Sequence, residues 1–138
     1  MHLKNQRGQA MIEFAIIIPF FIFMLVGFVY LAFLCHDFLT LKEIARSAAR
    51  TAAVGSMSNA DIRSVYGQTG FFTDLYKLDS GSSQDFNIEE RQETASSTSK
   101  MVVVTLTARR TIGSVKIMDL ELSLPETIQT SLAMHKEE

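Results

Sequence analysis

The sequence predicts an α+β protein in which one long N-terminal helix carries a small three-stranded antiparallel sheet. Three observations predict this fold class. Residues 14–35 contain no charged side chain, residues 38–52 continue with apolar side chains at three- and four-residue spacing, and β-branched residues gather from residue 101 onward. The first two patterns are typical of helices, and the third is typical of a strand.

Length and composition exclude several classes of protein. A chain of 138 residues has room for one small domain beside a membrane segment. The net charge of -2 provides no basic surface for nucleic acid. Cys35 has no second cysteine to pair with, and the three histidines are scattered without a CxxC motif, so neither a disulfide nor a metal site is predicted.

Catalytic motifs are missing as well. The sequence has no glycine-rich phosphate loop and no GxSxG motif, and no base can be identified for a Cys35 nucleophile. We therefore expect no catalytic residue, no cofactor and no small-molecule substrate, and we expect that the protein is not an enzyme.

The uncharged run is long enough to cross a membrane. At about 1.5 Å per residue, residues 14–35 reach roughly 33 Å, which exceeds a hydrocarbon core of about 30 Å. A cleaved secretory signal has a shorter apolar core, and a lipoprotein signal needs a small residue where Leu34 stands. A buried helix of a soluble protein would need more chain to surround it. We expect a transmembrane helix over residues 9–35.

The charges near the segment do not decide its orientation. Lys4 and Arg7 precede it, whereas Lys42, Arg46 and Arg50 follow it. The positive-inside rule compares these two groups, and here both sides are basic. The topology therefore needs another argument.

Glu13 stands at the entrance of the apolar run, where a carboxylate is costly if it enters lipid. In one interpretation the headgroups solvate it. In the other, a protease cuts after Gly8 and creates an α-ammonium group on Gln9, about one helical turn from Glu13. That cation would pair with Glu13 of the same helix or of an offset neighbour, so Glu13 would set the register of assembly.

The residues around this position resemble a known family. Arg7-Gly8-Gln9, Glu13-Phe14 and the segment IARSAARTAAVG at 44–55 are similar to TadE-like minor pseudopilins of the Flp (tight-adherence) type IV pilus. The likeness is carried by residues 7–55. Gln9 stands where type IVa pilins have Phe, which favours the Flp branch, and Lys136-Glu137 stands where the family more often ends in Arg-x-Glu.

The resemblance implies a pilin-like fold and a structural role in pilus assembly. Gly8 and Gln9 would flank the bond cut by a prepilin peptidase, residues 1–8 would form the leader, and Glu13 and Phe14 would serve assembly and register. The partners would be membrane lipid, the peptidase, other pilins or pseudopilins and the assembly platform. The protein would cross the bacterial inner membrane once, with its N-terminus cytoplasmic and its head periplasmic or in an extracellular pilus.

Two other functions stay open at this point. One is an uncleaved single-span anchor with a periplasmic binding or sensor head. The other is a pseudopilin of type II secretion, which shares the leader and differs in its machinery. The first differs from a pilus subunit by an intact N-terminus, and the second by its neighbouring genes.

Residues 36–55 are predicted to continue the helix as an amphipathic stem. Its apolar stripe becomes rich in alanine, which permits close backbone approach to a sheet or a second helix. Gly55 is a suitable C-terminal stop. The residues expected to pack are Ala45, Ala48, Ala49 and Ala52.

Residues 56–138 are predicted to form the head. A short helix begins at Asn59 or Asp61, either of which would be its N-cap, and ends at Tyr66. Residues 79–99 read as an exposed polar loop, in which NIEERQ forms a turn of helix. The three strands are expected at 101–107, at 112–124 with a break near Met118-Asp119, and at 127–135.

Overall fold

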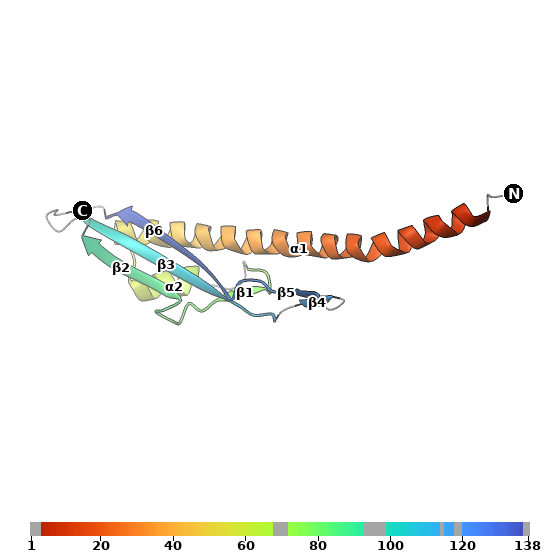
Figure 1. The fold of residues 1–138 in the computed structure, drawn as a ribbon. Helices are drawn as coiled ribbons and strands as arrows, with labels where there is room; N and C mark the ends of the chain where they lie inside the picture. The colour runs from red at the N-terminus through yellow and green to blue at the C-terminus, as the bar shows by residue number, and fades with distance from the viewer. Residues whose placement is uncertain (1–3, 68–71, 93–98, 114, 118–119, 137–138) are drawn as a thin grey trace.

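The structure is a computed structural model that describes residues 4–67, 72–92, 99–113, 115–117 and 120–136. Figure 1 shows a long helix whose C-terminal half lies against a small sheet, while its N-terminal half projects alone. The elements in chain order are α1 (Lys4–Val54), α2 (Asn59–Tyr66), β1 (Tyr76–Leu78), β2 (Phe86–Gln92), β3 (Lys100–Arg110), β4 (Val115–Ile117), β5 (Leu120–Leu122) and β6 (Thr127–His135).

Helix α1 is continuous from the predicted leader to the predicted stop, which confirms one helix over the apolar run and the stem. Pro19 lies inside it and has no N–H to donate to the carbonyl of Ala15. The helix curves toward its N-terminal end, drawn in red in Figure 1. It stops at Gly55, which has a φ of 68° and donates its N–H to the Ala52 carbonyl at 3.2 Å.

The main sheet has β3 at its centre and is three strands wide. Strand β6 pairs antiparallel with β3 from Met101↔His135 to Arg109↔Thr127, which occupies one edge of β3. Strands β2 and β1 share the other edge end to end, since β2 pairs with the first part of β3 and β1 with its last residues. The α+β class is therefore confirmed. The main sheet has four strands in place of the expected three, because β1 and β2 were not predicted as strands and residues 112–124 do not join this sheet.

Residues 86–92 correct the prediction of an exposed loop with a helical turn. They form β2, paired with β3 over its whole length. Only Phe86 and Ile88 are buried in this strand. Because an edge strand needs few inward side chains, its remaining polar residues hide the alternation that would identify it. The part of the predicted loop at 93–98 lies outside the described residues.

Residues 112–124 correct a second prediction. They do not form one strand of the main sheet, because β4 and β5 pair with each other as a separate antiparallel hairpin. Both edges of β3 are already occupied, and the two halves of this segment satisfy backbone groups against one another. The expected break at 118–119 lies outside the described residues.

Helix α2 begins at Asn59 as predicted, but neither expected residue is its N-cap. Ser58 occupies that position, with extended backbone, and its hydroxyl accepts the N–H of Asp61 at 3.2 Å. The same hydroxyl donates to the Asp61 carboxylate at 2.6 Å. Asp61 therefore supports the cap from inside the first turn.

The core lies between α1 and the inner face of the sheet, with α1 packed on β3 and β6. Strand β3 turns alternate side chains inward, and α2 adds Ile62. Alanines on α1 permit a close approach between helix and sheet. The fully buried side chains of the core are Leu41, Ala48, Ala49, Ile62, Tyr76, Phe86, Val104, Leu106 and Ala108.

Candidate membrane and assembly segment

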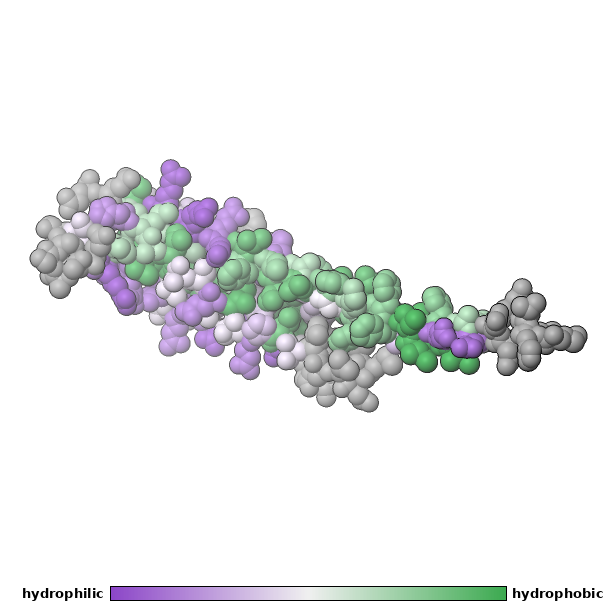
Figure 2. All heavy atoms as spheres, turned by 45° about the horizontal axis from the view of Figure 1, so that its top comes forward, coloured by the Kyte–Doolittle hydropathy of each residue, from purple (hydrophilic) through white to green (hydrophobic). Residues whose placement is uncertain are grey.

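The N-terminal half of α1 is apolar and exposed. It contains an 18-residue window with a mean hydropathy of 2.7, none of which is buried. By length and composition this helix can cross a membrane. On the face seen in Figure 2, apolar side chains cover most of the narrow part of the molecule, beyond the mixed surface of the head. Large exposed side chains there include Met11, Ile16, Phe20, Phe21, Phe28 and Phe33.

The head touches the far end of this apolar segment. Tyr30 and Leu34 are partly buried and pack against the core cluster. Cys35, one residue further, is exposed as a free thiol. The transition from free helix to packed stem therefore falls within about one helical turn of residue 34.

The predicted cleavage position lies inside α1, which passes through Gly8 and Gln9 without interruption. A Cβ built on Gly8 meets no atom within 4 Å, so this glycine is not required by packing. The Gln9 side-chain amide donates to the Glu13 carboxylate at 3.3 Å, one turn along the helix. The sequence predicts that Glu13 pairs with the α-ammonium group of Gln9 after cleavage. In the uncut chain, the side chains of these two residues already lie on one face of the helix.

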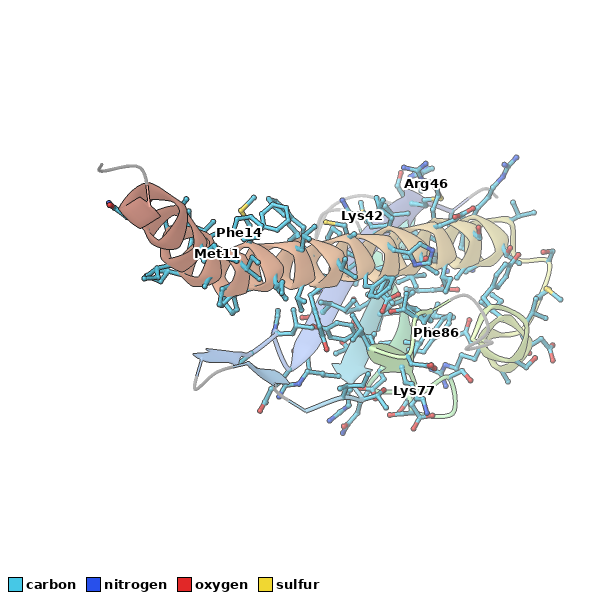
Figure 3. All side chains as sticks on the ribbon, turned by 90° about the vertical axis from the view of Figure 1, so that its right-hand side faces the viewer. Met11, Phe14, Lys42, Arg46, Lys77 and Phe86 are labelled. Atoms are coloured by element: carbon cyan, nitrogen blue, oxygen red, sulfur yellow. The ribbon has the colours of Figure 1, made fainter. Side chains whose placement is uncertain are left out.

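Glu13 stands among exposed apolar neighbours. Ile12 is 64% exposed and Phe14 is 65% exposed. Figure 3 shows Met11 and Phe14 on the part of α1 that extends beyond the head. Glu13 is therefore placed at the start of the apolar surface, between exposed apolar side chains.

The alanines predicted to pack lie on the sheet side of the stem. Ala45, Ala48, Ala49 and Ala52 are all buried. Lys42 and Arg46 occupy the opposite side of α1 (Figure 3). The Lys42 ammonium sits 5.0 Å from the centre of the Phe38 ring, which leaves the charge in solvent while covering this aromatic.

Sequence reasoning missed Asp37, whose carboxylate is fully buried. It accepts hydrogen bonds from the Thr73 N–H at 2.8 Å and the Thr73 hydroxyl at 2.6 Å. The imidazole Nδ1 of His36 lies 3.4 Å from it. A signal existed: Asp37 is in helical step with Leu41, Ile44 and the alanine stripe, so it falls on the face that packs.

An ion pair between Arg109 and Asp85 holds the segment that precedes β2 against β3. Arg109 donates twice to Asp85, with its Nε and one terminal nitrogen at 3.0 Å, and this carboxylate raises the Arg109 pKa. Arg110 donates to the Leu124 carbonyl at 2.7 Å. Both arginines at the end of β3 therefore make contacts that hold other segments of the head. Within the described residues, no group of three His, Cys, Asp or Glu side chains could hold a metal ion.

In the part of the chain that the structure describes, one helix is a candidate membrane span in its projecting half and part of the core of an α+β head in its other half. Residues 8–50 match the TadE-like protein family, so the chain carries a TadE-like segment and the resemblance seen in the sequence is confirmed. The match supports a protein associated with the Flp (tight-adherence) pilus. No curated protein and no solved structure gives a significant match to the chain.

Proposed function

We propose that this protein is a minor pseudopilin, a structural subunit and not an enzyme, that takes part in assembly of a Flp-type pilus. The TadE-like match over residues 8–50 carries the proposal. It spans the predicted cleavage position, the exposed apolar helix and the alanine-rich part of the stem. These are the parts that a filament subunit needs in one continuous element.

The continuity of α1 supports the proposal, because one helix links the candidate membrane segment to the head. The exposed half of the helix holds the subunit in lipid, and the other half is the core of the head. A force on the head is therefore transmitted along one rigid helix to the membrane segment. Withdrawing that apolar surface from lipid is unfavourable, so assembly would require platform proteins and an energy source.

Cleavage would occur between Gly8 and Gln9, on the cytoplasmic side, by a prepilin peptidase. Gly8 is the weakest helix former in this part of α1, about 1 kcal/mol less favourable than alanine. It lowers the cost of opening the helix at the bond to be cut. The new ammonium group on Gln9 would lie beside Glu13, either in the same helix or in a packed neighbour.

The test is the N-terminal mass of the protein extracted from membranes and from sheared pili. A terminus at Gln9, present in both fractions, is the expected result. A terminus at Met1 in both fractions would instead indicate an uncleaved anchor with a binding or sensor head. Trimmed protein that is absent from pili and required for type II secretion would assign it to that other machinery.

A further inference from the structure

Among the described residues, the outer edge of β6 is a row of backbone hydrogen-bonding groups that pair with no strand. The Lys136 N–H donates to the Lys100 carbonyl at 2.9 Å, and the Arg110 N–H donates to the Glu126 carbonyl at 2.8 Å. Hydrogen-bonded pairs alternate along an antiparallel ladder, so even-numbered residues of β6 bond to β3. The residues that direct N–H and C=O away from β3 are Thr127, Gln129, Ser131, Ala133 and His135.

In the described part of the chain, β6 pairs with no strand other than β3. Natural proteins protect such edges with lysine, other charges or proline. Thr127–His135 contains no proline, lysine, arginine or carboxylate. The opposite edge strand, β2, carries Glu89, Glu90 and Arg91. The two edges are therefore built differently, and the β6 edge is the one that offers nothing to repel a partner strand.

The direction of the strands limits what can pair there. Strand β6 runs in the same sense as α1 (Figure 1). Copies anchored in one membrane have their α1 helices parallel, so an antiparallel β6–β6 pair would require helices that point in opposite directions. Strand β2 runs parallel to β6, because both are antiparallel to β3. A neighbour's β2 therefore meets β6 with both anchors in the same orientation.

The chemistry of the two edges also fits. The Thr107 N–H donates to the Asp85 carbonyl at 2.8 Å, which fixes the alternation on that side and turns the backbone groups of Ile88 and Glu90 outward from β2. The charged side chains of β2 would meet only uncharged side chains along Thr127–Ala133. No like charges would be opposed across the new ladder.

We propose that β6 of one copy pairs in parallel with β2 of a second copy of this chain, which joins neighbouring heads into one continuous sheet. The inference rests on the proposed membrane anchoring and pilus role. The contact is heterologous, using a different edge on each copy, so it can repeat along a row of copies.

Disulfide trapping tests this contact in the full-length protein in its membrane. In a Cys35→Ser background, Ala133→Cys on β6 is combined in turn with Asn87→Cys, Glu89→Cys and Arg91→Cys on β2, which samples three registers. Glu89, Val103 and Ala133 lie in one row of the sheet. Within one copy, positions 89 and 133 are thus two strands apart, about 10 Å, which is too far for a disulfide.

Oxidation should convert at least one double-cysteine variant into dimers and higher multimers, which a reducing agent returns to monomer. Each single-cysteine variant should stay monomeric. Dimers from Ala133→Cys alone would mean that β6 pairs with β6, and would overturn the proposal. Monomers from all three combinations would overturn it as well.

Proline provides a matched pair of variants. Ser131→Pro removes an N–H that points away from β3, so the fold should persist while the multimers disappear. Leu132→Pro removes an N–H that bonds to β3 and should unfold the head. Multimers that survive Ser131→Pro would count against the contact. The N-terminal mass is read from the same samples, so a Gln9 terminus without cross-links rejects the strand pairing alone, and a Met1 terminus rejects the pilus role.

Discussion

The buried carboxylate of Asp37 accepts two hydrogen bonds from Thr73, at 2.8 Å from its N–H and 2.6 Å from its hydroxyl. The two residues are 36 positions apart, and they join the stem to the segment that leads into β1. A buried carboxylate without partners is strongly unfavourable. The contact therefore fixes the position of the head along α1, just beyond the apolar segment.

Loss of either partner should destabilise the head. We expect Thr73→Val and Asp37→Ala each to lower the free energy of unfolding by about 1.5–3 kcal/mol, the range for hydrogen bonds to a charged group. Denaturant unfolding in detergent, followed by circular dichroism, measures this. The double variant should lose less than the sum of the two. His36→Ala is the control, because its ring is largely exposed. Equal losses for His36→Ala and Asp37→Ala would contradict this role.

The alanine face of the stem should not accept a larger side chain. Ala48 is fully buried between α1 and the sheet, so Ala48→Leu is expected to destabilise the head by about 1–3 kcal/mol through overpacking. Arg50→Leu adds the same side chain at an exposed position of the same helix and should change stability by less than about 0.5 kcal/mol. Thermal unfolding of both variants compares them, and an unchanged melting temperature for Ala48→Leu would disprove close packing at this position.

Tyr76 should make the head sensitive to alkaline pH. Burial raises the pKa of its phenol, Arg110 opposes that shift and Asp37 adds to it. The hydroxyl donates to the Pro125 carbonyl at 2.8 Å. Because the folded-state pKa lies above the ordinary value of 10.0, this contribution is intact below pH 10 and is lost as pH rises through the folded-state pKa.

Replacing this tyrosine separates the two effects. Tyr76→Phe should cost about 1 kcal/mol at neutral pH, because the Pro125 carbonyl loses its donor. It should also remove part of the decline in stability above pH 10. Unfolding midpoints measured from pH 7 to pH 11 give both quantities. The expected result for Tyr66→Phe is that the alkaline decline persists. An identical decline in the wild type and in Tyr76→Phe would refute the assignment.

Helix α1 and strands β3 and β6 could be predicted because each carries its own periodic pattern. Uncharged and then amphipathic spacing marks α1, and β-branched residues mark β3. Such patterns depend on local sequence and on one buried face. Gly55 was likewise predictable, because a left-handed residue at a helix end favours glycine.

Features that depend on distant partners could not be predicted. Strand β2 is defined by its ladder with β3, and only two of its side chains are buried. Helical spacing places Asp37 on the packed face of α1, but no pattern near Asp37 identifies Thr73, 36 positions away, as the donor of two hydrogen bonds. The entrance residues Gly8, Gln9, Glu13 and Phe14 were predictable as a motif, but their roles concern a peptidase and neighbouring subunits.

Processing should depend on Gly8. We expect Gly8→Ala to leave most of the protein uncut, because the alanine adds a side chain next to the bond and strengthens the helix there by about 1 kcal/mol. Mass spectrometry of the membrane fraction measures the ratio of the two termini. Gly27→Ala, in the middle of the apolar segment, is the control and should be cut normally. Complete cleavage of the Gly8→Ala variant would contradict the prediction that processing requires glycine at position 8.

Assembly should depend on Glu13 after cleavage has taken place. In the uncut chain, Glu13 accepts the Gln9 side-chain amide at 3.3 Å, and trimming would add a cation to the same turn. Since a carboxylate at the edge of lipid is costly without an opposite charge, the pair forms most favourably when helices pack. We expect Glu13→Ala to be trimmed normally but to fall at least about tenfold in sheared pili, which corresponds to about 1.4 kcal/mol of lost pairing.

Two further variants separate charge from shape at this position. Glu13→Gln keeps the size and removes the charge, so it should fail like Glu13→Ala, whereas Glu13→Asp keeps the charge and should assemble in part. Glu43→Ala removes a carboxylate from the exposed side of the stem and should assemble fully. Quantitative immunoblots of membrane and pilus fractions compare them. If Glu13→Gln assembled as well as the wild type, the carboxylate would be a solvated surface charge and the register would have to come from the apolar side chains alone.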